Sequence, residues 1–303
     1  MANTPLNRYA SCDDATPGSA LATPAFNILP WASGTQIQLK SSSVVSPVFM
    51  PNGASAGQTN VSYWVEGSVT GQLMRDPTID RALSSLLMNS FTSKVLKPGT
   101  TEKPVCYEKM FVEGATSYYR QARGCQHTKM EIKWDADSIV DYTTDWIGQS
   151  DSRVTTMVTG ATYTNPSTSL KLGGNNVVVS LGGSLVATQL KKGSVSIELA
   201  RKTQTVCGSV SPIGMGFGGA RSVSFSLSFY KRDFTFDNAL IGNTPISVGV
   251  AFGGANTGYS FTSASVVFDA PQDEDDESGM LVTVTGKAGW DATAATDLTV
   301  TQL

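Results

Sequence analysis

The sequence is poor in the side chains that most catalytic and metal sites require. It contains 1 histidine and 4 cysteines in 303 residues, and only 16% of its residues are charged. A single histidine leaves little general acid–base chemistry near neutral pH and excludes histidine-rich metal sites. Cys12, Cys106, Cys125 and Cys207 are widely spaced and form no C-x-x-C pair, which predicts reduced, apolar thiols. We therefore expect no cofactor, no zinc site and no enzymatic activity.

An excess of basic charge and long hydrophobic runs are also missing. The formal net charge is −3 and the pI is about 5.2, which disfavours tight binding to nucleic-acid phosphates or anionic lipid but not the mere passage of DNA. The most apolar stretch, residues 177–190, is interrupted by serines and glycines and falls short of the roughly 20 apolar residues of a membrane span. The N-terminus lacks the pattern of a secretory signal, so we expect synthesis in the cytosol and no membrane partner.

What the sequence does contain is a repeated alternation of apolar and polar side chains. Residues 222–230 are the clearest case, with Val223, Phe225, Leu227 and Phe229 set between serines. A period of two is typical of a strand with one buried face. Similar runs, separated by Gly, Pro and Asn, occur at 36–40, 61–70, 129–134, 194–199, 246–252, 259–268 and 282–284. This spacing predicts roughly ten to twelve strands in a mainly β fold.

One segment, residues 77–88, has the pattern of a helix. Asp76 is a suitable N-cap and Pro77 occupies the first helical position, where its missing N–H is not needed. Ile79, Leu83, Leu86 and Leu87 form one apolar stripe. We expect this helix to pack against the β core.

Three segments have little apolar content to stabilise them. These are residues 1–25, the loop Pro47–Gln58 and the tail 291–303. We expect an N-terminal arm, a single β domain over residues 26–290 with a long loop at 47–58, and a C-terminal tail. Because such polar segments cannot offset their ordering entropy alone, we expect them to order against other subunits.

Two short motifs resemble catalytic or nucleotide-binding signatures. Gly53–Gly57 reads G-x-S-x-G, but a strand follows it where a helix is required, and the alternation places His127 on a polar face beside Lys129. Gly214–Gly219 reads G-x-G-x-x-G, but again no helix follows, so a glycine-rich hairpin loop is expected. Neither motif predicts an enzyme.

The densest charge feature is an acidic run of Asp273, Glu274, Asp275, Asp276 and Glu277. Such a run is typical of a solvated loop. Capture of a divalent cation stays open, although the twelve-residue spacing of a calcium loop is missing. A third interpretation is an acidic surface that faces other subunits or a passing polyanion.

The order of these elements resembles the tail tube proteins of long, non-contractile-tailed bacteriophages (siphophages). The resemblance begins at Tyr63–Met88, where a strand is followed by Gly71-Gln72-Leu73 and by the helix. It continues, in order, through residues 107–109, 118–120, 124–126, 193–201, 222–240, 246–252, 259, 270–271 and 282–289. It thus spans most of residues 30–290. The acidic run is denser than the family pattern, and the residues after Trp290 have no counterpart in it.

The resemblance implies a β-sandwich or partly closed barrel flanked by one short α-helix. It implies copies that form hexameric rings, stacked into a tube around a tape-measure protein and closed by tail terminator and tip proteins. Double-stranded DNA would pass through this tube without specific binding. The protein would belong to the virion and be made in the cytoplasm of a bacterial host.

On this interpretation we expect ring stacking through the loop and contacts through the N-terminal arm. The stacking residues are Pro47, Met50, Pro51, Asn52, Gly53 and Gln58, with Trp64 as an intersubunit anchor. Residues Asp273–Glu277 would form an acidic lumen or subunit surface.

A carbohydrate-binding or adhesin-type β-sandwich is the alternative. It would need an exposed aromatic platform, for which Trp31, Trp64, Trp134, Trp146 and Trp290 are available. We expect Trp134 to be buried, and Trp64 to lie on the strand face opposite Val61 and Val65.

Overall fold

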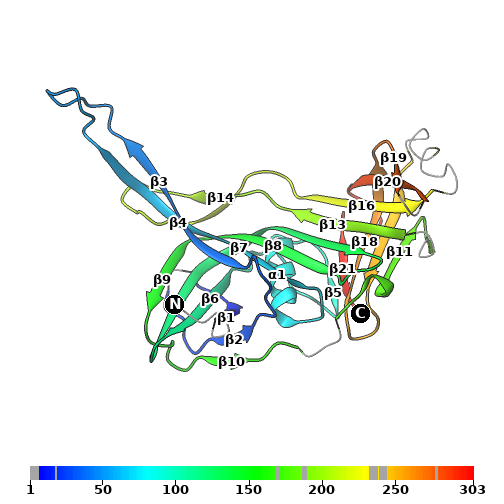
Figure 1. The fold of residues 1–303 in the computed structure, drawn as a ribbon, viewed down its shortest axis with the longest axis horizontal. Helices are drawn as coiled ribbons and strands as arrows, with labels where there is room; N and C mark the ends of the chain where they lie inside the picture. Colours follow the sequence, from blue (N-terminus) through cyan, green and yellow to red (C-terminus); the bar gives the residue numbers. More distant parts are fainter. Residues whose placement is uncertain are drawn as a thin grey trace.

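The computed structural model describes residues 7–17, 19–167, 171–185, 190–231, 238, 244–276 and 279–303. The fold is mainly β, as the sequence predicts, and the described residues contain one α-helix, α1 (Pro77–Leu87). Figure 1 shows an elongated body from which a long hairpin projects at one end. The strands of the body form two sheets that share one strand, with α1 packed beside them. Their strands pair antiparallel except for β10 and β2, which pair in parallel.

The larger sheet carries the alternating segments found in the sequence. Its strands are, in spatial order, β3 (Gln36–Val45), β4 (Gln58–Gln72), β8 (Asp141–Gly148), β7 (Thr116–Asp135), β13 (Leu190–Glu198), β16 (Ser222–Tyr230), β20 (Gly279–Ala288), β18 (Tyr259–Phe268), β17 (Ile246–Phe252) and β11 (Val177–Leu181). Short strands extend it: β5 (Val95–Leu96) and β21 (Thr299–Gln302) near β18, β12 (Ser184–Leu185) beside β11, and β19 (Gln272–Asp276) beside β20. The alternating runs found in the sequence do not include these short strands, nor β8 and β11.

The smaller sheet contains the N-terminal strands. Its order is β10 (Thr162–Thr164), β2 (Ala25–Ile28), β1 (Arg8–Asp13), β6 (Val105–Glu113), the first half of β7, and β9 (Ser150–Val154). A 3₁₀ turn, η2 (Gly174–Asn176), precedes β11. A separate hairpin is formed by β14 (Arg201–Gln204) and β15 (Gly214–Phe217).

Strand β7 passes from one sheet into the other. Residues 116–125 pair with β6, whereas residues 126–135 pair with β8 and β13. At the change of sheet Gly124 has φ +62°, and a Cβ there would lie 2.8 Å from Gln149 Cδ, so glycine is needed. The buried carboxylate of Asp14 accepts hydrogen bonds from Gly124 N (2.8 Å) and from the Arg123 guanidinium (2.6 and 2.8 Å). The N-terminal segment therefore fixes the point where the sheets join.

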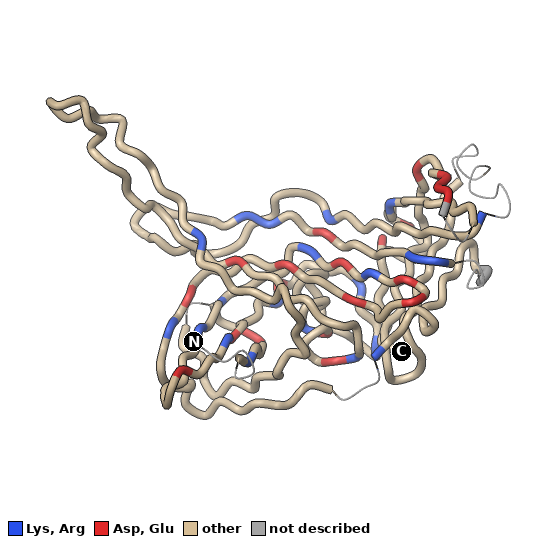
Figure 2. Tube along the Cα trace, viewed as in Figure 1, with Lys and Arg blue, Asp and Glu red and all other residues tan. Residues whose placement is uncertain are grey.

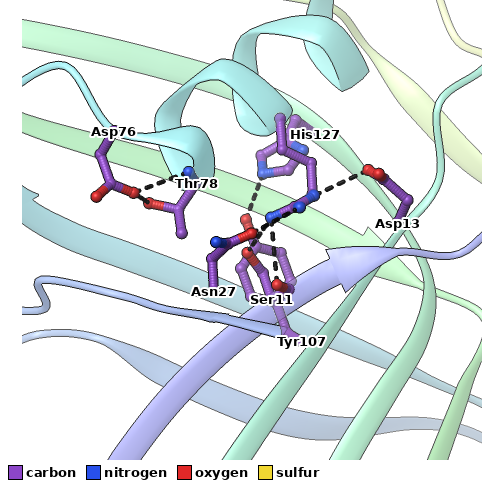
Figure 3. A network of polar contacts seen from close by, with 8 residues as sticks. Ser11, Asp13, Asn27, Asp76, Thr78, Tyr107 and His127 are labelled. Atoms are coloured by element: carbon purple, nitrogen blue, oxygen red, sulfur yellow. Dashed lines mark hydrogen bonds and ion pairs between the residues drawn. The ribbon is translucent and has the colours of Figure 1, made fainter. Parts of the chain in front are cut away.

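Helix α1 forms as the sequence predicts. Asp76 Oδ1 accepts from Thr78 N at 2.9 Å, and Met88 ends the helix with φ +52°. The apolar stripe of the helix is buried. Arg81 links the helix to the smaller sheet by donating hydrogen bonds to Ser11 O (3.2 Å), Asp13 Oδ1 (2.8 Å) and Asn27 Oδ1 (3.1 Å). Figure 3 shows this polar cluster beside the hydrogen-bonded pair of Tyr107 and His127.

The core contains two large indoles that each cover a glycine on the neighbouring strand. Trp146 pairs across strands with Gly67, and Trp134 pairs with Gly193. A Cβ on Gly67 would lie 2.1 Å from Trp146 Cζ2 and 2.7 Å from Gln36 O; one on Gly193 would lie 2.5 Å from Trp134 Cζ2. Both glycines therefore supply the space in which an indole lies flat on the sheet. The burial of Trp134 confirms the sequence expectation.

We expect Gly67→Ala to destabilise the fold, because the added methyl group must displace either the Trp146 ring or the β3 backbone. Overpacking of this kind costs about 1–3 kcal/mol in the free energy of unfolding. Gly254→Ala is the control, since a Cβ there meets nothing within 4 Å. Urea denaturation measures both, and equal midpoints for the two variants would contradict this account of the indole–glycine pairs.

His127 is buried, which corrects the expectation of a surface histidine. The pairing of β7 with β8 shifts register between His127 and Lys129, and this irregularity turns the ring to the opposite face. Its Nε2 lies 2.8 Å from Tyr107 Oη, and its side chain is 0% exposed. Burial, with a smaller contribution from the nearby Arg201 charge, lowers the pKa of His127 to about 3.

This lowered pKa makes part of the stability depend on pH. The folded state keeps His127 neutral, whereas the unfolded state takes up a proton near pH 6.5. Above about pH 6.5 His127 is neutral in both states and does not change the free energy of unfolding. As the pH falls from 6.5 toward 3, the free energy of unfolding decreases by about 1.4 kcal/mol per pH unit. We expect the wild-type protein to lose more stability between pH 7 and pH 4.5 than His127→Gln. Parallel losses in denaturation titrations would show that His127 does not titrate on unfolding.

The two terminal segments also contribute to the body. Tyr9, Ala10 and Cys12 of β1 are buried, and β21 pairs with β18 through Thr299–Gln302. The sequence predicts an N-terminal arm and a C-terminal tail at these positions. Their apolar side chains are few, but the antiparallel pairing with β6 and β18 satisfies their backbone groups.

Candidate assembly surface

The projecting hairpin is the feature of the molecule that most clearly calls for a partner. Strands β3 and β4 pair from Gln36↔Ser68 to Val45↔Gln58, but β8 supports β4 only from Val65 onward. Residues 39–64, here called the arm, therefore extend beyond the body, as Figure 1 shows.

A β-bulge at Val61 interrupts the pairing of the arm, because the register shifts opposite Ser42 and Ser43. Val61 is 44% exposed, whereas its neighbour Ser62 is buried. This bulge is why Val61 does not follow the inward alternation expected of it.

The tip of the arm, residues 46–57, is ordered by its own backbone. Ser46 N donates to Gly57 O (2.8 Å), Ala56 N to Val48 O (3.0 Å) and Met50 N to Ala54 O (2.8 Å). Gly53, with φ +81°, closes the turn. The polar sequence of this loop predicts that it becomes ordered against other subunits. In the structure, hydrogen bonds within the same chain hold it in place. The tip is thus preorganised before any contact.

Exposed apolar side chains are concentrated on the arm. Phe49 is 79% exposed, and Met50 is 49% exposed. Other exposed side chains on the arm are Leu39, Val44, Val45, Val48 and Val61. Ile37, at the root, is buried, so the alternation that buries side chains in the sheet continues outward where no core exists to receive them. A concentration of exposed apolar side chains on a projecting hairpin is typical of a protein contact.

The hairpin β14–β15 adds to this surface at the arm's root. Tyr63 N donates to Val210 O at 2.8 Å, which brings the two hairpins side by side. Val206, Val210, Ile213 and Phe217 of the second hairpin are exposed. The glycines of the G-x-G-x-x-G pattern lie in and just after β15, in agreement with a hairpin and not a nucleotide-binding turn.

A buried arginine anchors the second hairpin to the body. Arg201 donates to His127 O (Nε, 3.1 Å) and Ser85 O (Nη2, 3.3 Å) and hydrogen-bonds Gln126. Glu102 lies 3.7 Å from its Nη1. Burial lowers the pKa of Arg201, and Glu102 partly offsets this. The hairpin thus depends on one charge held between α1 and β7.

The structure brings most of the sequence-predicted stacking residues together. Exposed positions at or beside the tip are Pro47, Met50, Pro51, Asn52, Gly53 and Gln58. Trp64 lies apart from them, nearer the root, half-buried, with its Nε1 donating to Glu66 Oε1 at 2.7 Å. Val48 and Phe49 lie inside the predicted stacking loop but are not among its named residues, and Val44 and Val45 lie outside it. The sequence VVSPVFM, residues 44–50, contains five apolar residues, which indicate an apolar surface even though the segment has no strand or helix pattern.

The acidic run forms a strand, where the sequence pattern favoured a loop. Residues 272–276 pair as β19 with β20, and Asp273 forms an ion pair with Lys231. Glu274 and Asp275 are exposed. Glu277 and the side chain of Asp276 lie outside the described residues. Figures 1 and 2 show this acidic strand at the end of the body opposite the arm. Within the described ranges, no group of three His, Cys, Asp or Glu side chains could hold a metal ion.

The remaining candidate sites are not assembled. Ser55 of the G-x-S-x-G pattern is exposed on the tip, whereas His127 is buried in the body. Of the tryptophans, Trp134 and Trp146 are buried and Trp290 is 69% exposed. Trp31 packs edge-on against Tyr9, at 5.1 Å between ring centroids. These positions do not form an aromatic platform for a glycan.

We expect Arg201→Gln to destabilise the protein by about 3 kcal/mol, because it removes a buried guanidinium group and the hydrogen bonds that this group donates to His127 O and Ser85 O. Lys202→Gln, on the next, exposed residue of β14, changes the same charge and should stay within about 0.5 kcal/mol. Chemical denaturation measures both. Equal, small effects would show that Arg201 does not anchor the hairpin.

Comparison with known proteins identifies a family. The family model described as phage tail tube protein matches residues 7–293. No curated protein matches the chain. In the part of the chain that the structure describes, α1 is too short to cross a membrane and no other helix is a candidate.

Proposed function

Because the chain belongs to the phage tail tube protein family, we propose that its copies form hexameric rings that stack into the tail tube of a siphophage. The family match supports a structural role in the virion tail. The proposed partners are further copies of this chain, the tape-measure protein inside the tube, and the terminator and tip proteins at its ends. The role is non-enzymatic, and the chain would be made in the cytoplasm of the bacterial host.

The observation that carries this proposal is the arm. An uncharged, preorganised tip with Phe49 79% exposed has no role within the chain that presents it. A contact between the arm and a different surface of another copy is heterologous, and heterologous contacts build rings or open stacks. We therefore assign the arm, with Pro47, Met50, Pro51, Asn52, Gly53 and Gln58, to contacts between rings, and Trp64 near its root to a contact between subunits.

Lateral contacts have support in the free edge of the larger sheet. Within the described residues β4 is the only strand that pairs with β3, so no strand covers the other edge of β3. Such an edge is suited to pairing with a strand of a neighbouring subunit. We propose that lateral contacts close this edge within a ring.

Passage of DNA is supported by charge. The chain has a net charge of −3, and β19 presents acidic side chains at the end away from the arm. We propose that the acidic run of Asp273, Glu274, Asp275, Asp276 and Glu277, whose first four residues belong to β19, faces the lumen or a neighbouring subunit. Like charge along the path would keep DNA phosphates from binding as they pass.

Electron microscopy of the concentrated protein tests the proposal. We expect rings and tubes from the wild-type chain, and folded protein without tubes after deletion of Pro51–Gly57. Circular dichroism and melting temperature should be nearly unchanged, because these residues contact only one another and the adjacent arm.

A charge substitution gives the matched control. Phe49→Asp should block assembly, whereas Val267→Asp, at a position 45% exposed on β18, should not. Wild-type protein that stays monomeric even with native tails as seeds would overturn the proposal, and normal tubes from the deletion would overturn the role of the arm.

A further inference from the structure

A pocket lies at the edge of the smaller sheet where β6, β7 and β9 meet. Its volume is about 640 Å³, and it is lined by Phe111, Tyr118, Tyr119, Arg120, Arg153 and Val154, with Thr155 and Thr156. The aromatic wall is built by cross-strand pairing, with Phe111 opposite Tyr118 and their rings stacked at 5.0 Å. Tyr119 stands opposite Val154, which is 37% exposed. The size and the lining fit an apolar side chain with a short stretch of backbone.

The polar groups of the pocket favour an occupant that offers hydrogen-bond acceptors and carries no positive charge. Arg120 Nε donates to Asp151 Oδ1 at 2.8 Å, and Arg153 Nη2 lies 2.9 Å from Asp151 Oδ2. The buried Asp151 thus holds both guanidinium groups in place. Arg120 Nη2 is buried without a hydrogen-bond partner among the described residues. A peptide carbonyl brought in with an apolar side chain would satisfy that donor.

We propose that the pocket receives the arm tip of a second copy of this chain, with the Phe49 ring against Phe111 and Tyr118. This inference rests on the proposed assembly and names the receiving surface for the arm. Residues 46–57 carry no basic side chain that Arg120 and Arg153 would repel, and they supply backbone carbonyl groups as hydrogen-bond acceptors. The rigid hairpin tip presents Phe49 outward, so little conformational entropy is lost on docking.

The geometry requires the occupant's tip to come from another copy. Arg120 Nη1 donates to Ile37 O at 2.7 Å, so the pocket adjoins the root of its own arm. From Ile37 to Val45 an extended strand spans about 26 Å, at about 3.3 Å per residue. The tip of the same chain is held away from the pocket by that length. Tip-to-root docking is head-to-tail and can repeat without limit, as a stack requires.

Disulfide trapping tests the contact directly. The variant carries Phe49→Cys with Arg153→Cys, because Arg153 stands opposite Arg120 and so shares the sheet face of Tyr118. It also carries Cys207→Ser, because Cys207 is exposed whereas the other native cysteines are buried. After assembly and mild oxidation we expect a ladder of covalent multimers on a non-reducing gel, since each copy carries both ends of the contact. The control pairs Phe49→Cys with Val267→Cys in the same background and should give no ladder.

The outcomes separate this inference from the proposed function. Tubes without a ladder, or with a ladder no stronger than the control, overturn the tip-in-pocket contact and leave the tube assembly standing. Dimers from Phe49→Cys alone would show tip-to-tip contact and also overturn it. Absence of assembly in the wild-type chain overturns the proposed function, and this inference with it.

A double-substitution cycle provides a second measurement that needs no cysteine. Phe49→Ala and Tyr118→Ala should each raise the concentration needed for assembly by about tenfold or more, as truncation of an aromatic anchor does. The double variant should be little worse than either one, because both remove the same contact. Tyr118→Phe should assemble like the wild type. Effects that multiply in the double variant would show that the two residues do not meet.

Discussion

Hydrogen bonding along β7 is the interaction on which the rest of the structure depends. This strand of 20 residues pairs with β6 and β9 in its first half and with β8 and β13 in its second, so both sheets share one backbone. The turn at Gly124, held by Asp14, sets the angle between the sheets. Helix α1 and the buried group of His127, Tyr107 and Arg201 lie against the same strand. Loss of β7 would therefore separate every layer of the fold.

The exposed hairpins are possible only because their roots are firmly held. β4 gains a second neighbour, β8, from Val65 inward, and β14 is fixed by the buried guanidinium of Arg201. Beyond these points the chain has no core to contribute to its stability, and apolar side chains face solvent. The body supplies the stability, and the arm exposes the apolar surface that a partner can bury. This division separates residues that keep the protein folded from those assigned to assembly.

The sequence was informative where a periodic pattern coincides with a buried face. The helix from Pro77 and the alternation of Val223 to Phe229 are present as expected, because burial alone determines them. His127 and Val61 were misplaced, because a bulge reverses the face of a strand without any mark in the residue pattern. The acidic residues of β19 pair as a strand because β20 satisfies their backbone, which outweighs their preference for a loop. For the assembly surface, the sequence predicted the loop that contains Phe49 but did not single that residue out, since an apolar residue is ordinarily assigned to a core.

The antiparallel register of β3 and β4 restricts how the arm can change in length. Side chains alternate between the two faces of a hairpin, so inserting one residue pair, one per strand, moves every side chain beyond it to the other face, whereas inserting two pairs restores the original face. Each restoring step adds about 6.6 Å of reach. Homologous arms that keep the same contact face should therefore differ in length by an even number of residue pairs. The spacing between copies that such an arm sets would then change in steps of about 6.6 Å.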